Sequence, residues 1–288
     1  MRDEQEMLQA RRYAVHDPAL RGRIKCFWAL RRLEPFSVDH ILMPVGNIDV
    51  VYNFGAPVAY VFPDREARVD GAHVLGVRTG PVRVVHTAPI IMIGVSFDDF
   101  AALPFLKRPL RCLAHRIIDA KPENFPGLPS FAPESDAPRR RLGCEETLEE
   151  RLVSLESAWL RSADFSLAPS EEELRVLRAF RDKDDDERIL DFCRRGGTHP
   201  KKLERMLYKF VGLSPKQYAD VRRAQRLYAE IARAEGAELA FAANDFGYFD
   251  QSHMGRNVRK HFDVSPAALR KKRLTAKSII RIVDSEEM

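Results

Sequence analysis

The chain has 288 residues, a length that suits two domains. Hydrophobic residues make up 45% of it and charged residues 31%, which allows a buried core and excludes global disorder. No apolar run reaches the roughly 18 residues that a membrane-spanning helix needs. The first six residues include three acids where a signal peptide would need an apolar segment, so we expect a cytoplasmic protein with no membrane partner.

The net charge of +5 is unevenly distributed along the chain. Residues 1–169 are neutral overall, with 22 basic and 22 acidic residues, whereas residues 191–273 hold 18 basic and 9 acidic residues. An acidic stretch, residues 170–190, lies between them. This split predicts that the C-terminal half binds a polyanion and that the N-terminal half does something else.

The first 120 residues have the pattern of β structure. Short apolar or alternating runs, separated by Gly, Pro, Asn and Asp, predict strands at Ile48–Phe54, Val58–Phe62, Val82–His86 and Ile90–Phe97. Their close spacing favours antiparallel strands in a sandwich or barrel. Short helices are expected after them, at Asp98–Leu106 and Leu110–Ile118.

A linker and an amphipathic helix are expected next. Residues 121–143 contain five prolines and two glycines, which predicts a loop. In Glu145–Arg161, four apolar residues recur on one helical face: Leu148, Leu152, Leu155 and Trp159. The stripe fits packing onto the β region and fits a dimerisation helix equally well, because it does not say what it packs against.

The rest of the chain is predicted to be helical to about residue 273. The expected helices are Ser170–Arg181, Asp185–Arg194, Pro200–Val211, Pro215–Ala234, Leu239–Asp245, Gln251–Phe262 and Pro266–Arg273. We therefore predict an α+β protein with a β-rich regulatory or dimerisation domain (1–140), a linker and amphipathic helix (141–169), an all-α domain (170–273) and a tail (274–288) of no predicted structure.

An internal repeat with an offset of 51 residues is the most informative feature. It aligns 192–218 with 243–269, so that Arg205 matches Arg256 and Ser214-Pro215 matches Ser265-Pro266. Each copy reads as a short helix, a glycine-containing turn (Gly247 in the second copy), a second helix and then Ser-Pro at the start of another helix. That is a helix-turn-helix motif, present twice.

The second helix of each copy has an apolar face and a polar face. The apolar residues are Leu203, Leu207 and Phe210 in the first copy, and Met254, Val258 and Phe262 in the second. The polar residues are Lys201, Glu204, Arg205 and Tyr208 in the first, and Gln251, Ser252, Gly255, Arg256 and Arg259 in the second. Arg and Gln can bond base edges in the major groove and Gly255 would permit close approach, so we predict two DNA-reading helices.

A long helix, Pro215–Ala234, separates the two copies. We expect it to hold them in a fixed relation, so that one chain reaches successive major grooves. A basic run, Lys271–Arg273, would add contacts to the DNA backbone.

These residues resemble bacterial AraC/XylS-type transcription regulators. The resemblance rests on Asp245–Pro266, with its Gly-aromatic turn, its Gln-Ser-His stretch and its closing Ser-Pro, and on Leu203–Tyr218 in the first copy. It implies promoter or operator DNA and RNA polymerase as partners, with base contacts from Lys201, Glu204 and Arg205 in the first copy and from Gln251, Ser252, Gly255 and Arg256 in the second. His199 stands where the family has a capping Ser, and Asp263 where it has a glycine.

The N-terminal half resembles the family less closely, through Met43–Phe54. The resemblance implies a regulatory domain that senses a small-molecule effector or forms a homodimer through residues 1–165, without saying which. It does not reveal the operator, or whether the protein is an activator.

Catalytic and metal chemistry is not indicated. The histidines of the β region, His40, His73, His86 and His115, form no His-x-His pair and have no carboxylate at ligand spacing, so we predict no metal. Asp98-Asp99 fits a polar helix start. The widely spaced cysteines, Cys26, Cys112, Cys144 and Cys193, are expected to be reduced and packed as small apolar groups. No nucleophile elbow or phosphate loop is present, so we expect neither an enzyme nor a cofactor.

The sequence also allows a second interpretation of the function. Glu204 and Gly255 in the polar faces, with the acids at 182–187, also fit a ligand-binding or protein-interaction regulator that has lost specific DNA binding. A third hypothesis is an enzyme in the N-terminal half, because β-barrels contain clefts in which an active site can lie.

Overall fold

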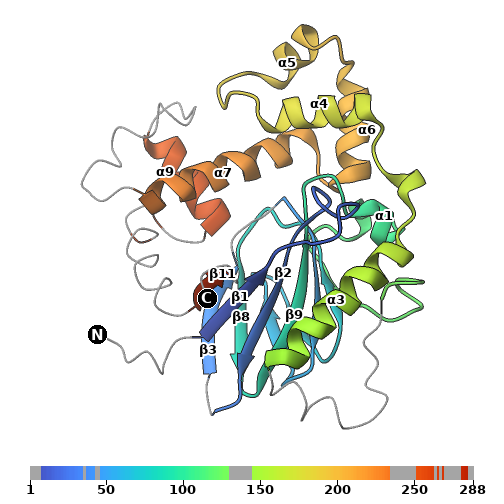
Figure 1. Cartoon of the computed structure of the whole chain (residues 1–288). Coiled ribbons are helices and arrows are strands. Elements are labelled where there is room, and N and C mark those ends of the chain that lie inside the picture. Colours follow the sequence, from blue (N-terminus) through green and yellow to red (C-terminus); the bar gives the residue numbers. More distant parts are fainter. Residues whose placement is uncertain are drawn as a thin grey trace.

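The computed structural model describes residues 8–34, 37–42, 46–129, 145–233, 251–262, 265, 268 and 280–284. Two β-sheets form the N-terminal part and helices form the C-terminal part (Figure 1). The predicted α+β class is therefore confirmed.

The large sheet has seven strands in the order β10-β7-β4-β9-β2-β1-β11, and the small sheet has four in the order β3-β8-β5-β6. Their strands are β1 (Leu8–Tyr13), β2 (Ile24–Arg32), β3 (Ser37–Leu42), β4 (Asp49–Asn53), β5 (Val58–Val61), β6 (Glu66–Val69), β7 (His73–Leu75), β8 (Val82–Thr87), β9 (Ile90–Phe97), β10 (Ile117–Asp119) and β11 (Ile280–Asp284). Neighbouring strands pair antiparallel, apart from β11, which pairs parallel with β1.

The two sheets pack face to face around an apolar layer. Val51 and Leu75 of the large sheet share one buried cluster with Val58, Val82 and Val84 of the small sheet. Alternation explains the arrangement, since residues two apart on a strand point to the same face. The described strands form a sandwich rather than a closed barrel.

The amphipathic helix is α3 (Glu145–Ser162), which runs alongside the large sheet (Figure 1). Leu155 and Trp159 are fully buried there, and the Trp159 ring lies edge-on to Phe97 and Phe105, with centroids 5.3 and 5.8 Å away. These two residues of the stripe therefore pack onto the β region and are not available to a second chain. The side chains of the other two predicted stripe residues lie outside the described part.

The two predicted short helices need correction. The first begins only at α1 (Leu103–Leu106), because Phe100 has a φ of 69°, which a right-handed helix cannot contain. Asp98-Asp99 therefore does not start a helix. The second prediction holds only over the 3₁₀ turn η2 (Leu110–Cys112), because the chain then turns at His115 (φ 60°) and pairs with β7 as β10.

Two further expectations change. The C-terminal tail contributes strand β11. Of the cysteines, Cys193 is buried, Cys26 is half-buried and Cys112 is exposed, so the prediction that all pack as apolar groups is wrong for Cys112. Cys144 lies outside the described residues.

The helical part agrees with the predicted pattern over α4 (Glu171–Arg181), α5 (Ile189–Arg195), α6 (Pro200–Phe210), α7 (Pro215–Arg233) and α9 (Gln251–Phe262), with the 3₁₀ turn η3 (Phe165–Leu167) before them. A capping box between Ser170 and Glu173 starts α4. Helix α5 begins four residues later than predicted, because the chain before it forms a loop. The predicted helix Leu239–Asp245 and nearly all of Pro266–Arg273 lie outside the described residues.

No helix in the described part of the chain combines the length and the apolar character needed to cross a bilayer.

A buried hydrogen-bonded histidine links the two sheets. His73 Nδ1 donates to Gly71 O (3.0 Å), and Nε2 lies 2.7 Å from the hydroxyl of Tyr60, which donates to it. Burial lowers the pKa of His73 to about 4, outweighing the hydrogen bond to Gly71 and the nearby Asp119, which raise it. The neutral ring is thus the form that the fold accommodates.

We predict that His73 makes folding pH-dependent. An unfolded histidine has a pKa near 6.5, so below that pH the unfolded chain binds more protons than the folded one. Stability contributed by His73 should fall by about 3 kcal/mol as the pH drops from about 6.5 to about 4. His73→Gln should lose this part of the pH dependence, which urea unfolding at a series of pH values would measure; identical pH profiles for both proteins would contradict the prediction.

Candidate nucleic-acid interface

The first helix-turn-helix unit consists of α5, a turn at Gly196-Gly197 and α6. Gly197 has a φ of 59°, a left-handed conformation that glycine adopts without steric cost. His199 is the N-cap of α6, and its Nδ1 accepts a hydrogen bond from Lys201 N at 3.2 Å. The histidine therefore performs the capping role that the usual serine would have.

Helices α6 and α9 have the same burial pattern at the 51-residue offset. The buried positions of α6 and its C-cap are Leu203, Met206, Leu207, Phe210 and Val211, and their counterparts in α9, all buried, are Met254, Asn257, Val258, His261 and Phe262. The residues that face the packed interior are therefore at equivalent positions in the two helices, and so are the residues that face outward.

The start of the next helix is also repeated. Ser214 Oγ accepts a hydrogen bond from Gln217 N at 3.3 Å, and Ser265 Oγ accepts one from Ala268 N at 3.2 Å. These four residues are equivalent at the same offset, so the two Ser-Pro sequences perform the same capping role.

The outward face of α6 carries Lys201, Glu204 and Arg205, all exposed. Within the described part of the chain, the Arg205 side chain has no hydrogen-bond or ion-pair partner. Tyr208, also predicted on this face, is half-buried, and the Arg111 guanidinium lies 4.6 Å from its ring centroid. The C-terminal end of this face is thus partly covered by the β region.

The outward face of α9 carries Ser252, Arg256 and Arg259, all exposed. No atom lies within 4 Å of the place where a Cβ on Gly255 would stand, so this glycine opens onto free space. The Gln251 side chain and the whole of Gly247 lie outside the described residues.

The spacer helix α7 is held by the acidic stretch, not left free to bind a polyanion. The Asp185 carboxylate pairs with Arg226, whose Nε donates to Oδ2 at 3.0 Å, and lies 3.6 Å from Arg223 Nε. Because these arginines face an internal carboxylate, we do not assign them to the interface.

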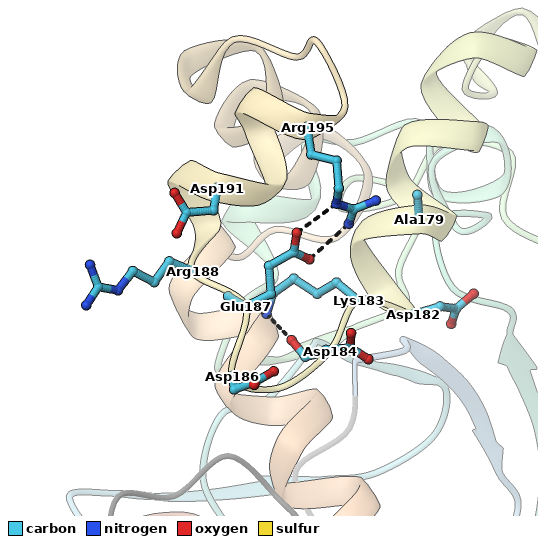
Figure 2. A pocket seen from close by; sticks show the side chains of 9 residues that line it. All are labelled: Ala179, Asp182, Lys183, Asp184, Asp186, Glu187, Arg188, Asp191 and Arg195. Atoms are coloured by element: carbon cyan, nitrogen blue, oxygen red, sulfur yellow. Dashed lines mark hydrogen bonds and ion pairs between the residues drawn. The ribbon is translucent and has the colours of Figure 1, made fainter.

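A hollow lies beside this stretch, between the end of α4 and α5, and its lining is mainly acidic (Figure 2). Glu187 is paired with Arg195 through two hydrogen bonds of 2.9 and 3.0 Å. Lys183 donates to the carbonyls of Asp184 and Glu187 at 2.8 Å. These bonds brace the α4–α5 loop and pair one of the lining carboxylates, that of Glu187.

Residues 192–272 match the model of a helix-turn-helix domain family. The matched range contains both copies of the repeat. The chain carries an AraC-type helix-turn-helix domain. Residues 16–119 match a domain of unknown function, DUF6597, and no curated protein matches the sequence.

The chain also matches solved structures with which it shares little sequence identity. The chain is similar to ToxT from Vibrio cholerae (10% identity, 86% of this chain and 98% of that chain covered, TM-score 0.41) and to unsaturated fatty acid-bound ToxT from V. cholerae strain SCE256 (11%, 85% and 93%, 0.39). It is also similar to the AraC-like transcriptional activator CuxR (14%, 73% and 78%, 0.29).

The β region makes further contacts with the AraC-type domain that sequence patterns do not reveal. Gly212 lies against the Leu110 carbonyl, the Tyr218 hydroxyl donates to Asp99 Oδ2 at 3.3 Å, and His261 Nδ1 donates to the Thr79 carbonyl. The third of these contacts reaches the end of α9, so α9 contacts the β region, as α6 does through Tyr208 and Arg111.

Metal binding has no support in the described part of the chain, where no three His, Cys, Asp or Glu side chains are grouped so as to hold an ion. Of the four histidines considered above, His73 and His86 are buried, His115 is half-buried, and the side chain of His40 lies outside the described residues.

We predict that Gly212 is required for the AraC-type domain to dock on the β region. Its φ is 92°, and an added Cβ would stand 2.6 Å from Leu110 O, so Gly212→Ala combines backbone strain with a clash. Gly197→Ala is the matched control, because its φ is also positive but nothing lies within 4 Å. We expect a loss of about 1–2 kcal/mol for the control and a further 1–3 kcal/mol or so for Gly212→Ala, measured by urea unfolding; equal losses would contradict the predicted clash.

Proposed function

We propose that this chain is a sequence-specific DNA-binding transcription regulator of the AraC type, which inserts α6 and α9 into successive major grooves. The matched burial of the two helices carries the proposal. It leaves Arg205 and Arg256 at equivalent positions, both exposed.

The chemistry of the two outward faces suits DNA. An arginine can bond guanine O6 and N7 together, and a serine can bond base edges or phosphates. Lys201 and Arg259, also exposed, suit phosphate contacts. The open space at Gly255 lets a base pair approach the backbone of α9.

Helix α7 suits the spacing of the two grooves. Its 19 residues extend over about 28 Å at 1.5 Å per residue. Successive major grooves on one face of a duplex lie about 34 Å apart. Asp185 pairs with Arg223 and Arg226 in the middle of α7, and Lys260 of α9 pairs with Asp220 of α7 at 3.2 Å.

The remaining roles follow from the same proposal. RNA polymerase is the expected protein partner, and the nucleoid of a bacterial cytoplasm is the expected location. The β region is the regulatory part, which would bind a small-molecule effector or a second copy of the chain.

Two arginine variants test the proposal. Arg205→Ala and Arg256→Ala should each weaken binding to a selected operator by about 1–3 kcal/mol, or roughly 5- to 150-fold. Arg68→Ala, an exposed arginine of β6, is the control and should leave affinity unchanged. Fluorescence anisotropy with DNA chosen by in vitro selection would measure this, and wild-type affinity in both recognition-helix variants would refute the assignment.

Salt dependence separates this function from the alternative, a regulator that has lost specific DNA binding. The Arg111 guanidinium partly covers Tyr208 on the outward face of α6, and this contact favours the alternative. Binding through several phosphates predicts that affinity falls steeply as salt is raised. A folded full-length chain that binds no selected DNA at low salt would support the alternative.

A further inference from the structure

A buried arginine in the β sandwich lacks an anionic partner. Arg78 is only 3% exposed, and its one hydrogen bond runs from Nη1 to Gly76 O at 3.2 Å. Its Nε is buried with no partner, and no carboxylate in the described part of the chain lies within 4.0 Å of the guanidinium. A buried charge is costly unless it is paired and hydrogen-bonded, so this guanidinium is available for an anion.

The loop that carries Arg78 is fixed on both sides. Gly76 N donates to Arg116 O (3.0 Å), and His115 N donates to Val77 O (2.8 Å). The backbones approach so closely that a Cβ on Gly76 would stand 1.7 Å from Leu113 O, which only glycine permits. The inward position of Arg78 is therefore built into the fold.

A carboxylate faces the same end of the sandwich. Asp49 pairs with Leu75 in the β4–β7 register, three residues before Arg78, and its carboxylate interacts electrostatically with the guanidinium without forming an ion pair. Ser96 Oγ (2.5 Å) and Asn47 Nδ2 (3.2 Å) both donate to Asp49 Oδ1. Neither bond involves Oδ2, which leaves that oxygen able to accept a hydrogen bond.

We propose that Arg78 and Asp49 recognise a small acid that carries a hydrogen-bond donor beside its carboxylate, as amino acids and hydroxy acids do. The ligand carboxylate binds the Arg78 guanidinium, and the neighbouring ammonium or hydroxyl donates to Asp49. Such a ligand satisfies both groups at once, whereas a plain anion would satisfy only the first and would be repelled by the second.

The surroundings also suit an effector. The apolar core of the sandwich, which includes the buried residues Val51, Leu75 and Val82, lies beside this polar end. The residue after Arg78 is Thr79, whose carbonyl accepts the hydrogen bond from His261 of α9. That the site regulates DNA binding rests on the proposed function; that it binds the ligand does not.

The binding experiment uses the full chain without DNA. Thermal unfolding is followed at constant ionic strength and neutral pH with sets of four compounds on one carbon skeleton: the 2-amino acid, the 2-hydroxy acid, the unsubstituted acid and the amide of that acid. In at least one set, the amino or hydroxy acid should raise Tm by several degrees at a concentration about a hundred times its Kd. The unsubstituted acid should raise it less and the amide not at all.

Variants identify the groups responsible. Arg78→Met should abolish the Tm increase while leaving the ligand-free Tm equal to or above that of wild type, because it removes a poorly compensated buried charge. Arg68→Met is the matched control on the surface and should keep the full response. Asp49→Asn should reduce the response to the donor-bearing acid to that of the unsubstituted acid. If Arg78→Met does not fold, Arg78→Lys should weaken binding at least tenfold, because an ammonium cannot bond a carboxylate in a bidentate manner.

The proposal is wrong if no acid of the panel raises Tm, if the amide acts as strongly as the acid, or if the Arg78 variant that folds responds like wild type. Failure of the protein to bind DNA would refute the proposed function and leave this result untouched, because no DNA is present.

Discussion

The buried side chain of Tyr218 joins the β region to the helices. Its ring lies 5.8 Å from that of Phe100 and 6.3 Å from that of Phe180, and its hydroxyl donates to Asp99. One continuous apolar cluster therefore extends from the large sheet through Tyr218 into the first helix-turn-helix unit. Rotating that unit away from the β region would expose this cluster to water, which the hydrophobic effect opposes. The orientation of α6 is thus set by the β region.

The second helix-turn-helix unit is attached differently. Phe262 of α9 stacks on Tyr228 of α7, with ring centroids 5.8 Å apart, and the hydrogen bond that connects the described residues of α9 to the β region runs from His261 to Thr79. A polar contact of this kind contributes only about 1 kcal/mol net, because water can replace it when it breaks. Helix α9 can therefore change its position relative to the β region at a lower free-energy cost than α6.

The elements that local sequence patterns determine could be predicted from the sequence. The 51-residue repeat and the 3.6-residue periodicity predicted α6 and α9, and alternation predicted β4, β5, β8 and β9. Strand β2 was missed because it is buried on both faces, with Phe27 in one cluster and Leu30 in the other, so that its sequence does not alternate. The contacts of Asp99, Thr79 and Leu110 with the helices could not be predicted, since their partners are about 100 or more residues away along the chain. The unpaired state of Arg78 is likewise invisible in a sequence, because it depends on which carboxylates the fold brings near.

Departures from the internal repeat nevertheless carried a signal for these contacts. At the buried positions where the first copy has Met206 and Phe210, the second has Asn257 and His261, which the sequence alone presents as defects of an apolar face. The structure gives a reason for the second: His261 is buried where it donates to the Thr79 carbonyl, and burial lowers its pKa so that the ring stays neutral. Gly212, whose counterpart is Asp263, is the other such case, since glycine is needed there to pass the Leu110 carbonyl. At these two positions, one copy of the repeat carries a residue that contacts the β region, and the other copy carries a different residue.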